Sequence, residues 1–265
     1  MSKPFWPLSV SSWGEEERAA AHAVIDGDQH TMGSTVAAFE RSLAEFHRVK
    51  HAVMTNSGSS ANLIAAAALR HLHGTVAAGW HEVIVPAIAW ATTYAPFQQH
   101  GFKLVVVDVD PATLNVDVQQ VAAAIGPRTI GIAGVSILGN PAPLDELCRL
   151  CYAHDLFFFE DNCESLGAIL EGQRCGSFGD VGTLSFFFSH HLNTVEGGAV
   201  LTNDDHLRDL LVCLRAHGWT RDLPPNSPLR PFVEVDDLSY YYNFVLPGYN
   251  VRPTELAAAV GLVQL

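Results

Sequence analysis

Apolar runs of strand length alternate with stretches of helical periodicity along most of the chain. The runs that predict strands span residues 51–55, 82–87, 103–109, 129–138, 156–161 and 182–188. The stretches that predict helices span residues 59–72, 116–125 and 144–155, with a further helix over 252–265 that is still in progress at the last residue. Near-continuous apolar strands separated by helices predict an α/β fold, in which a mostly parallel sheet is covered by helices on both faces.

The composition of the chain limits the kinds of partner that it is expected to bind. The chain has 265 residues, of which 48% are hydrophobic and 16% charged, so a substantial core is expected rather than disorder. A net charge of −13, with the 15 basic residues scattered, argues against nucleic acid and against an anionic membrane surface as partners. The absence of a long apolar run and of a signal-like start, together with five irregularly spaced cysteines, predicts a cytoplasmic protein with reduced thiols.

Ligands of open α/β sheets gather at the carboxyl ends of the strands, so the residues that follow each strand are the candidates. After the first strand, Gly58 permits a tight turn before a helix that begins near Ser59 or Ser60. The free amides of that helix suit a phosphate, although a plain serine N-cap explains the same residues. After the second strand, Trp90 is placed either to stack on a flat ring or to be buried as a structural tryptophan.

Two later strands also end in polar residues. Asp161 closes a buried apolar strand, which is costly for a carboxylate unless it has a partner, and it is read either as the partner of a cationic ring nitrogen or as a helix N-cap. Glu164 is either its partner in a capping arrangement or a ligand contact. Ser185 faces either the site or the core, and His190 and His191 follow it. Adjacent side chains of an extended strand point to opposite sides, so only one histidine should face a ligand unless the chain turns there.

Near the end of the chain, Asn250 and Arg252 precede a helix with Pro253 expected in its first turn. Arginine suits an anionic group, although a solvated arginine is the more common case. The joint order of these features is more informative than any one of them. A phosphate loop, a stacking aromatic, an aspartate at a strand end and a glycine turn form the layout of a pyridoxal phosphate site.

On these segments the chain resembles the fold type I pyridoxal phosphate enzymes of nucleotide-sugar metabolism, the sugar aminotransferases and dehydratases. The matching segments are NSGSSANL, VPAIAWATT, DVDPATLNVD, GNPAPLDEL, FFEDNCESLGA, GSFGDVGTLSFF, EGGAVLTND and GYNVRPTELAAA. The resemblance runs from about Gly33 to Leu265. It implies an N-terminal segment over 1–32 and a large cofactor-binding domain over 33–265, with the small C-terminal domain of the family missing or truncated.

The resemblance also implies roles for the cofactor-binding residues. Gly58 and Ser59 would bind the phosphate of pyridoxal 5'-phosphate, with help from Ser185. Trp90 would stack on the pyridine ring, and Asp161 would pair with the ring nitrogen and keep it protonated.

Further roles concern the ring hydroxyl, the substrate and a second subunit. Glu164 stands near the ring hydroxyl, where most members have glutamine. Asn250 would reach the phosphate in a neighbouring subunit, because these sites lie at the interface of a homodimer. His217, in the segment HGWTRDL, and Arg252 are expected to contact the substrate.

One departure from the family pattern decides the expected reaction. Transaminating members carry the lysine that binds the cofactor covalently in the motif S-F-x-x-x-K-N, where this chain has His190 and His191. Its only lysines are Lys3, Lys50 and Lys103, far from this motif. The cofactor would therefore be held without a covalent bond, as pyridoxamine 5'-phosphate.

Replacement of that lysine by histidine resembles the sugar 3-dehydratases of the family. It implies removal of the carbon-3 hydroxyl of a 4-keto-6-deoxy sugar nucleotide, with a GDP-linked sugar expected, in the biosynthesis of lipopolysaccharide O-antigen. His190 would be the base and then the acid, because imidazole titrates near neutrality. L-Glutamate would regenerate the amine form of the cofactor.

Alternatives to the dehydratase stay open at this level. One is a catalytically inactive or regulatory relative, although Asp161 and Trp90 are both retained. Others are an aminotransferase or dehydratase of another sugar nucleotide. A metal-dependent lyase using His190, His191 and Glu196 is disfavoured, because adjacent histidines rarely bind one metal, and we predict no metal site.

Overall fold

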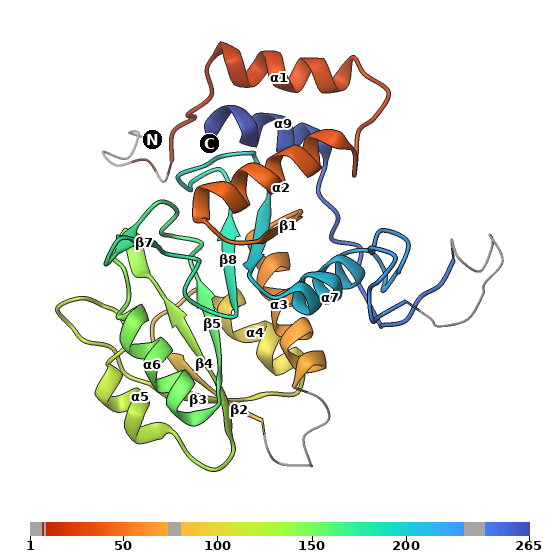
Figure 1. Cartoon of the computed structure of the whole chain (residues 1–265). Coiled ribbons are helices and arrows are strands. Elements are labelled where there is room, and N and C mark those ends of the chain that lie inside the picture. The colour runs from red at the N-terminus through yellow and green to blue at the C-terminus, as the bar shows by residue number, and fades with distance from the viewer. Residues whose placement is uncertain (1–6, 8, 74–80, 231–241) are drawn as a thin grey trace.

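A seven-stranded sheet with helices on both faces forms the centre of the molecule (Figure 1). The computed structural model describes residues 7, 9–73, 81–230 and 242–265. The strands are β1 (His51–Thr55), β2 (Glu82–Pro86), β3 (Lys103–Val107), β4 (Thr129–Val135), β5 (Phe157–Asp161), β8 (Val181–Ser185) and β9 (Gly198–Thr202). A separate two-stranded ribbon joins β6 (Ile169–Leu170) and β7 (Gln173–Arg174).

Four of the six strand pairings in the sheet are parallel. The order is β1-β9-β8-β5-β4-β2-β3, and β9 runs antiparallel to both of its neighbours, β1 and β8. The predicted α/β class with a mainly parallel sheet is confirmed. The carboxyl ends of β1, β2, β4, β5 and β8 therefore meet at one edge of the sheet.

The helices divide between the two faces. Their bounds are α1 (Glu15–Ile25), α2 (Ser34–His47), α3 (Gly58–Leu72), α4 (Ala91–Gln99), α5 (Val118–Ala124), α6 (Leu144–His154), α7 (Asp205–Arg215) and α9 (Glu255–Gln264). One face of the sheet carries α3, α4 and α7, and the other carries α2, α5 and α6.

The alternation of side chains along each strand builds both cores. On β5, Phe157 and Phe159 pack on the face covered by α3, whereas Phe158 packs on the face covered by α6. This period of two follows from the pleat of the strand. Both faces of the sheet are buried, which explains why the strands read as continuous apolar runs in the sequence.

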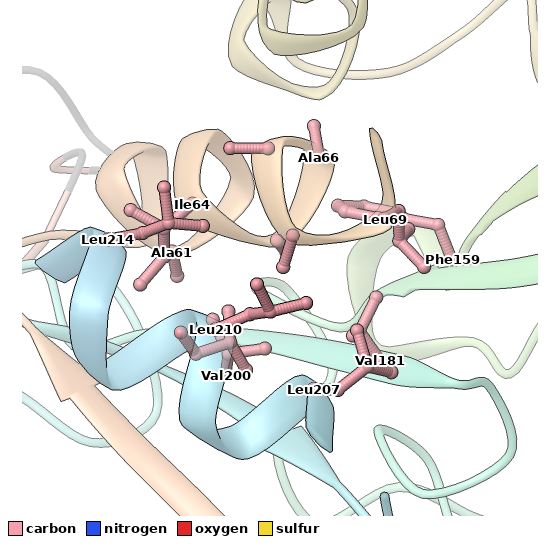
Figure 2. Packing of buried hydrophobic residues seen from close by; sticks show 14 of the residues in the cluster. Ala61, Ile64, Ala66, Leu69, Phe159, Val181, Val200, Leu207, Leu210 and Leu214 are labelled. Carbon is pink, nitrogen blue, oxygen red and sulfur yellow. The ribbon is translucent and has the colours of Figure 1, made fainter. Parts of the chain in front are cut away.

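Helix α3 is largely buried and positions the first part of the site. Figure 2 shows its residues Ala61, Ile64 and Leu69 packed against side chains of the sheet and of α7, among them Val200 and Leu210. The run from Ala65 to Ala68 is fully buried. These small side chains let α3 approach the sheet closely, so its N-terminus is fixed at the carboxyl edge.

The last helix is anchored to the start of α2. Glu255 of α9 accepts hydrogen bonds from the backbone N–H groups of Gly33, Thr35 and Val36 (2.8–2.9 Å). Helix α1 packs against α9, as Figure 1 shows at the upper end of the molecule. The boundary expected between residues 32 and 33 falls just before α2, and the division into two parts stays a prediction.

Across the described ranges, none of the helices has the length and apolar character needed to cross a membrane.

Candidate active site

A cavity of about 710 Å³ opens at the carboxyl edge of the sheet. Its walls come from the N-terminus of α3, from the start of α4, and from the segments that follow β4, β5 and β8. The lining residues are Ser57, Gly58, Ser59, Asn62, Trp90, Thr92, Thr93, Val135, Leu138, Asp161, Cys163, Glu164, Ser185, Phe187, Ser189, His190, His191 and Glu196. Seven of the ten residues predicted for the site are therefore brought together.

The N-terminus of α3 forms a tight cradle beside β8. The N-cap is Ser57, whose Oγ accepts a hydrogen bond from the N–H of Ser60 at 3.1 Å. The serine cap exists, but the helix begins at Gly58, one residue before the predicted start. A Cβ on Gly58 would lie 2.5 Å from the Cβ of Ser185, so only glycine fits between helix and strand. The free N–H groups of this first turn and the helix dipole suit a phosphate group.

Asp161 is the buried carboxylate of the cavity, with 4% of its surface exposed. Its Oδ2 accepts hydrogen bonds from Thr93 Oγ1 (2.8 Å) and Asn62 Nδ2 (3.0 Å), and its Oδ1 accepts one from the N–H of Cys163 (3.1 Å). These donors are neutral, so the carboxylate keeps its charge available for a cationic ligand. Turns follow Asp161 rather than a helix, and the N-cap interpretation is therefore wrong.

The adjacent carboxylate faces the opposite side of the sheet. Glu160 is fully buried and accepts hydrogen bonds from the N–H groups of Gly176 and Phe178. Burial raises the pKa of Glu160 to about 7. The pleat of β5 thus separates a structural carboxylate from the one that faces the cavity.

Trp90 stands at the mouth of the cavity as the N-cap residue of α4. With 69% of its surface exposed, it is not a core residue, and the buried structural interpretation is wrong. Its ring is free to cover one face of a flat ligand.

Glu164 makes no capping arrangement with Asp161. Its Oε2 accepts a hydrogen bond from the N–H of Leu138 at 2.9 Å. Leu138 has a left-handed backbone (φ 53°) and lines the cavity together with Glu164. The carboxylate therefore has a fixed position beside the ligand space.

The two histidines follow a turn rather than an extended strand. Strand β8 ends at Ser185, and the N–H of His190 donates a hydrogen bond to the carbonyl oxygen of Phe187 at 2.9 Å. Because the chain turns here, His190 and His191 both line the cavity. Partial burial lowers the pKa of His190; the carboxylates of Glu164 and Asp161 oppose this effect, and His191 adds to it.

Three predicted residues lie outside the cavity of their own chain. The backbones of Ala216 and Asn250 form an isolated bridge, and the N–H of His217 donates to Tyr249 O at 2.7 Å. Arg252 Nε donates to Asn250 Oδ1 at 3.0 Å. The cap of the following helix is Thr254, so Pro253 precedes the helix and does not lie in its first turn.

The lysines that the structure describes are remote from the cavity. Lys50 precedes β1 and Lys103 begins β3, so both stand at the opposite edge of the sheet. A five-residue strand spans roughly 16 Å. Lys3 belongs to the part of the chain outside the described residues. The lining residues of the cavity include three carboxylates, two imidazoles and, within the described ranges, neither lysine nor arginine.

Sequence reasoning did not single out Asn62, Thr93 or Cys163, although all three contact the Asp161 carboxylate. Asn62 lies four residues after Gly58, one helical turn along the same face, and this spacing was the available signal. Burial, followed by the charge of Asp161, raises the pKa of the Cys163 thiol well above its ordinary range, so it stays protonated.

The donor set suits pyridoxal or pyridoxamine 5'-phosphate. The cradle at Gly58 matches the phosphate, and exposed Trp90 matches a planar ring. Buried Asp161, held by neutral donors, matches a protonated ring nitrogen. The residues present therefore fit the cofactor without a covalent attachment point.

Comparison with known proteins identifies the family. The model of the DegT/DnrJ/EryC1/StrS aminotransferase family matches residues 11–265. The chain belongs to this family. The family is pyridoxal phosphate dependent, in agreement with the cofactor expected from the site.

Among its members, GDP-4-keto-6-deoxy-D-mannose 3-dehydratase from Yersinia pseudotuberculosis is 45% identical over 260 residues, which are 98% of this chain and 66% of that protein. A solved GDP-4-keto-6-deoxymannose-3-dehydratase, a histidine-to-asparagine mutant with bound GDP-perosamine, has a TM-score of 0.93 and 41% identity. A second structure of that enzyme, with a trapped PLP–glutamate geminal diamine, has a TM-score of 0.92 and 41% identity. Both structural matches cover 98% of this chain and 67% of the other. The chain thus spans about two thirds of the length of these family members.

Proposed function

We propose that the chain is a pyridoxal phosphate-dependent 3-dehydratase of a sugar nucleotide, with GDP-4-keto-6-deoxymannose as its substrate and L-glutamate as the amino donor. Such a lyase serves the synthesis of deoxysugars of the O-antigen. The relatives that carry the name of this enzyme, one with a PLP–glutamate adduct and one with a GDP-sugar, support the choice of substrates.

The observation that carries the proposal is the position of His190. It lines the same cavity as Asp161 and Trp90, at the place where the transaminating pattern has its lysine. An imidazole there can transfer protons but cannot capture the cofactor covalently. The mutation of a histidine to asparagine in the solved relative is consistent with a histidine of special interest in that enzyme.

Each side chain of the cavity has a definite task in this reaction. The bound cofactor supplies an amino group for the 4-keto carbon and a ring that takes up an electron pair. The first turn of α3 holds the phosphate, Asp161 keeps the ring nitrogen protonated, and Trp90 covers the ring. Glu164, which accepts a hydrogen bond from the N–H of Leu138, would stand beside the ring hydroxyl of the bound cofactor.

His190 handles the protons. Its imidazole removes a proton from the amino-bearing carbon of the cofactor and then delivers one to the departing carbon-3 hydroxyl. The lowered pKa of His190 keeps the imidazole neutral near physiological pH, which is the form that a base requires.

A homodimer completes the site. Asn250, Arg252 and His217 lie together outside the cavity of their own chain, and Asn250 and His217 are exposed. We place these residues at the cavity of a second copy, where Asn250 meets the cofactor phosphate and the other two meet the substrate. They would supply the cationic group that the walls of the cavity lack.

The test is turnover of GDP-4-keto-6-deoxymannose with glutamate and pyridoxal 5'-phosphate. The product should be one oxygen atom lighter than the substrate, with 2-oxoglutarate and ammonia formed in equal amounts. The variant His190→Asn should retain the cofactor and lose dehydration by a factor of about 10²–10⁴, the usual contribution of a general base. Cofactor binding without turnover by the wild-type chain would instead favour an inactive or regulatory relative.

A further inference from the structure

Asn62 is a buried polar residue to which the proposed reaction assigns no role. It lies one turn into α3, lines the cavity and has 2% of its surface exposed. A buried amide is costly unless its polar atoms are satisfied, so the partners of Asn62 indicate its purpose.

The amide of Asn62 joins three elements that meet at the cavity. Its Nδ2 donates to Asp161 Oδ2 at 3.0 Å and to the backbone carbonyl oxygen of Thr92 at 3.1 Å. Asp161 belongs to β5, Thr92 to α4 and Asn62 itself to α3. One side chain therefore ties the carboxylate at the end of the central strand to both helices beside it.

These and two further hydrogen bonds restrict rotation of the Asp161 carboxylate. Thr93 Oγ1 and Asn62 Nδ2 both hold Oδ2, and the N–H of Cys163 holds Oδ1. Hydrogen bonds to a charged group are stronger than those between neutral groups. The orientation of Asp161 is thus set from outside its own strand.

We propose that Asn62 is a positioning residue for the cofactor ring: it fixes the Asp161 carboxylate to the helix whose first turn holds the cofactor phosphate. This inference rests on the proposed pyridoxal phosphate site and adds a residue to it. Gly58 and Asn62 share α3, so the phosphate cradle and the carboxylate are held at one separation. A ligand that carries both a phosphate and a basic ring nitrogen on one planar ring would engage the cradle and the carboxylate together.

A second observation points to a ligand. The Oδ1 atom of Asn62 is buried and has no hydrogen-bond partner among the described residues. Because unsatisfied buried acceptors are rare and costly, the unpartnered Oδ1 in the cavity wall favours a functional over a purely structural role for Asn62. A leucine at this position would keep the volume of the side chain and lose both hydrogen bonds.

The experiment measures ligand binding to the full chain and does not depend on turnover. Asn62→Leu should weaken pyridoxal 5'-phosphate by about tenfold or more, as expected for a lost hydrogen bond to a charged group. It should also lower the pH at which the absorbance of the bound cofactor reports loss of the proton from the ring nitrogen. Binding of benzyl phosphate, which has no ring nitrogen, should stay within about twofold of wild type, because α3 still presents the cradle.

Two threonine variants complete the design. Thr93→Val removes the other side-chain donor to Asp161 Oδ2 and should change cofactor binding in the same direction, whether or not Asn62→Leu folds well. Thr202→Val is the matched control, because this buried hydroxyl donates to the carbonyl oxygen of Asp180 instead. Its cofactor affinity should equal that of wild type.

The outcomes separate this inference from the proposed function. Equal weakening of both ligands by Asn62→Leu would mean a general structural role, and unchanged binding of both would mean no role; either overturns the inference and leaves the dehydratase standing. A wild-type chain that binds no cofactor would overturn both. Selective loss of pyridoxal 5'-phosphate affinity supports the inference even if no dehydration is found.

Discussion

At the scale of single residues, two neighbouring carboxylates influence the pKa of His190. Burial lowers the pKa of its imidazole, while Glu164 and Asp161 oppose that change. Asp161 is committed to the ring nitrogen in the proposed site. Glu164 is therefore the residue that can be altered to tune the histidine.

We expect Glu164→Gln to shift the pH dependence of dehydration toward lower pH. Removing the negative charge removes a contribution that raises the pKa of His190, so this pKa falls further below its ordinary value of 6.5. The neutral base then persists to lower pH, and the acidic limb of kcat/KM against pH moves with it. Glutamine keeps an oxygen that can accept from the N–H of Leu138, so the local structure is preserved.

The pH profile of Glu196→Gln provides the comparison, because this carboxylate lines the same cavity but does not act on the pKa of His190. A limb that moves to higher pH in Glu164→Gln, or moves equally in both variants, would contradict the assignment.

The sequence alone was enough to predict those site residues that lie at or close to the end of a strand. Asp161 and Trp90 were placed at the cavity because Asp161 ends one strand and Trp90 follows another within a few residues. The sequence could not decide whether Trp90 is buried, since its exposure depends on how α4 packs. The sequence also left open whether one or both histidines face the cavity, because this depends on a turn after Ser185 that no proline or glycine marks.

At the scale of elements, the contact between α3 and β8 shapes the cradle that we propose for the cofactor phosphate. Gly58 begins the helix, and a Cβ there would lie 2.5 Å from the Cβ of Ser185, an atom that is fixed to the backbone of β8. Neither element can retreat easily, because α3 is buried from Ile64 to Leu69 and packs against the sheet there.

We expect Gly58→Ala to weaken pyridoxal 5'-phosphate binding by about tenfold or more, because the first turn of α3 must move away from Ser185 and its N–H groups leave the phosphate. Isothermal titration of the cofactor measures this change. Gly126→Ala is the matched control, since a Cβ at Gly126 meets no atom within 4 Å. Normal cofactor affinity in Gly58→Ala would show that the cradle lies elsewhere.

Element prediction from the sequence succeeded where periodicity and burial agree. The buried runs gave β1 with its observed bounds and placed β2, β3, β4, β5 and β8 within a few residues. Strand β9 was not identified as a strand, because its five residues follow a glycine turn and show no alternation. Its antiparallel direction is a consequence of pairing with β1 and β8, which only tertiary structure reveals.

At the scale of the whole molecule, the proposed site needs two chains. The residues around Asn250 and His217 stand apart from the cavity of their own chain, whereas Asp161 and His190 lie inside it. Each cavity of a symmetric dimer would then combine the two sets from different subunits.

Mixing two inactive variants tests this arrangement. Asp161→Asn and Asn250→Ala should each abolish or strongly reduce dehydration. After the two are unfolded and refolded together, about half of the dimers are mixed and each contains one intact site, so about a quarter of wild-type activity should return. The Asp161→Asn, His190→Asn pair is the control: both residues lie in the cavity of their own chain, so each cavity of a mixed dimer carries one of the two changes. Recovery of about a quarter of wild-type activity in the first mixture, and none in the control mixture, supports the shared site.

The two mixtures differ in what each cavity receives. With Asp161→Asn and His190→Asn, every cavity of a mixed dimer keeps one changed residue, so the control mixture should recover no activity. With Asp161→Asn and Asn250→Ala, one cavity of each mixed dimer has native residues from both chains. Absence of recovery in that mixture would contradict a site shared between subunits.

Covalent attachment of the cofactor is the property that separates this site from a transaminating one. Intact mass spectrometry after borohydride reduction of the chain with one equivalent of pyridoxal 5'-phosphate measures it directly. The variant His190→Lys is the positive control, because it restores an amine at the place where the family pattern has its lysine. We predict an unmodified mass for the wild-type chain and a reduced cofactor adduct for His190→Lys. A stable adduct on the wild-type chain, at Lys3, Lys50 or Lys103, would contradict the lysine-free site and the role of His190 as its base.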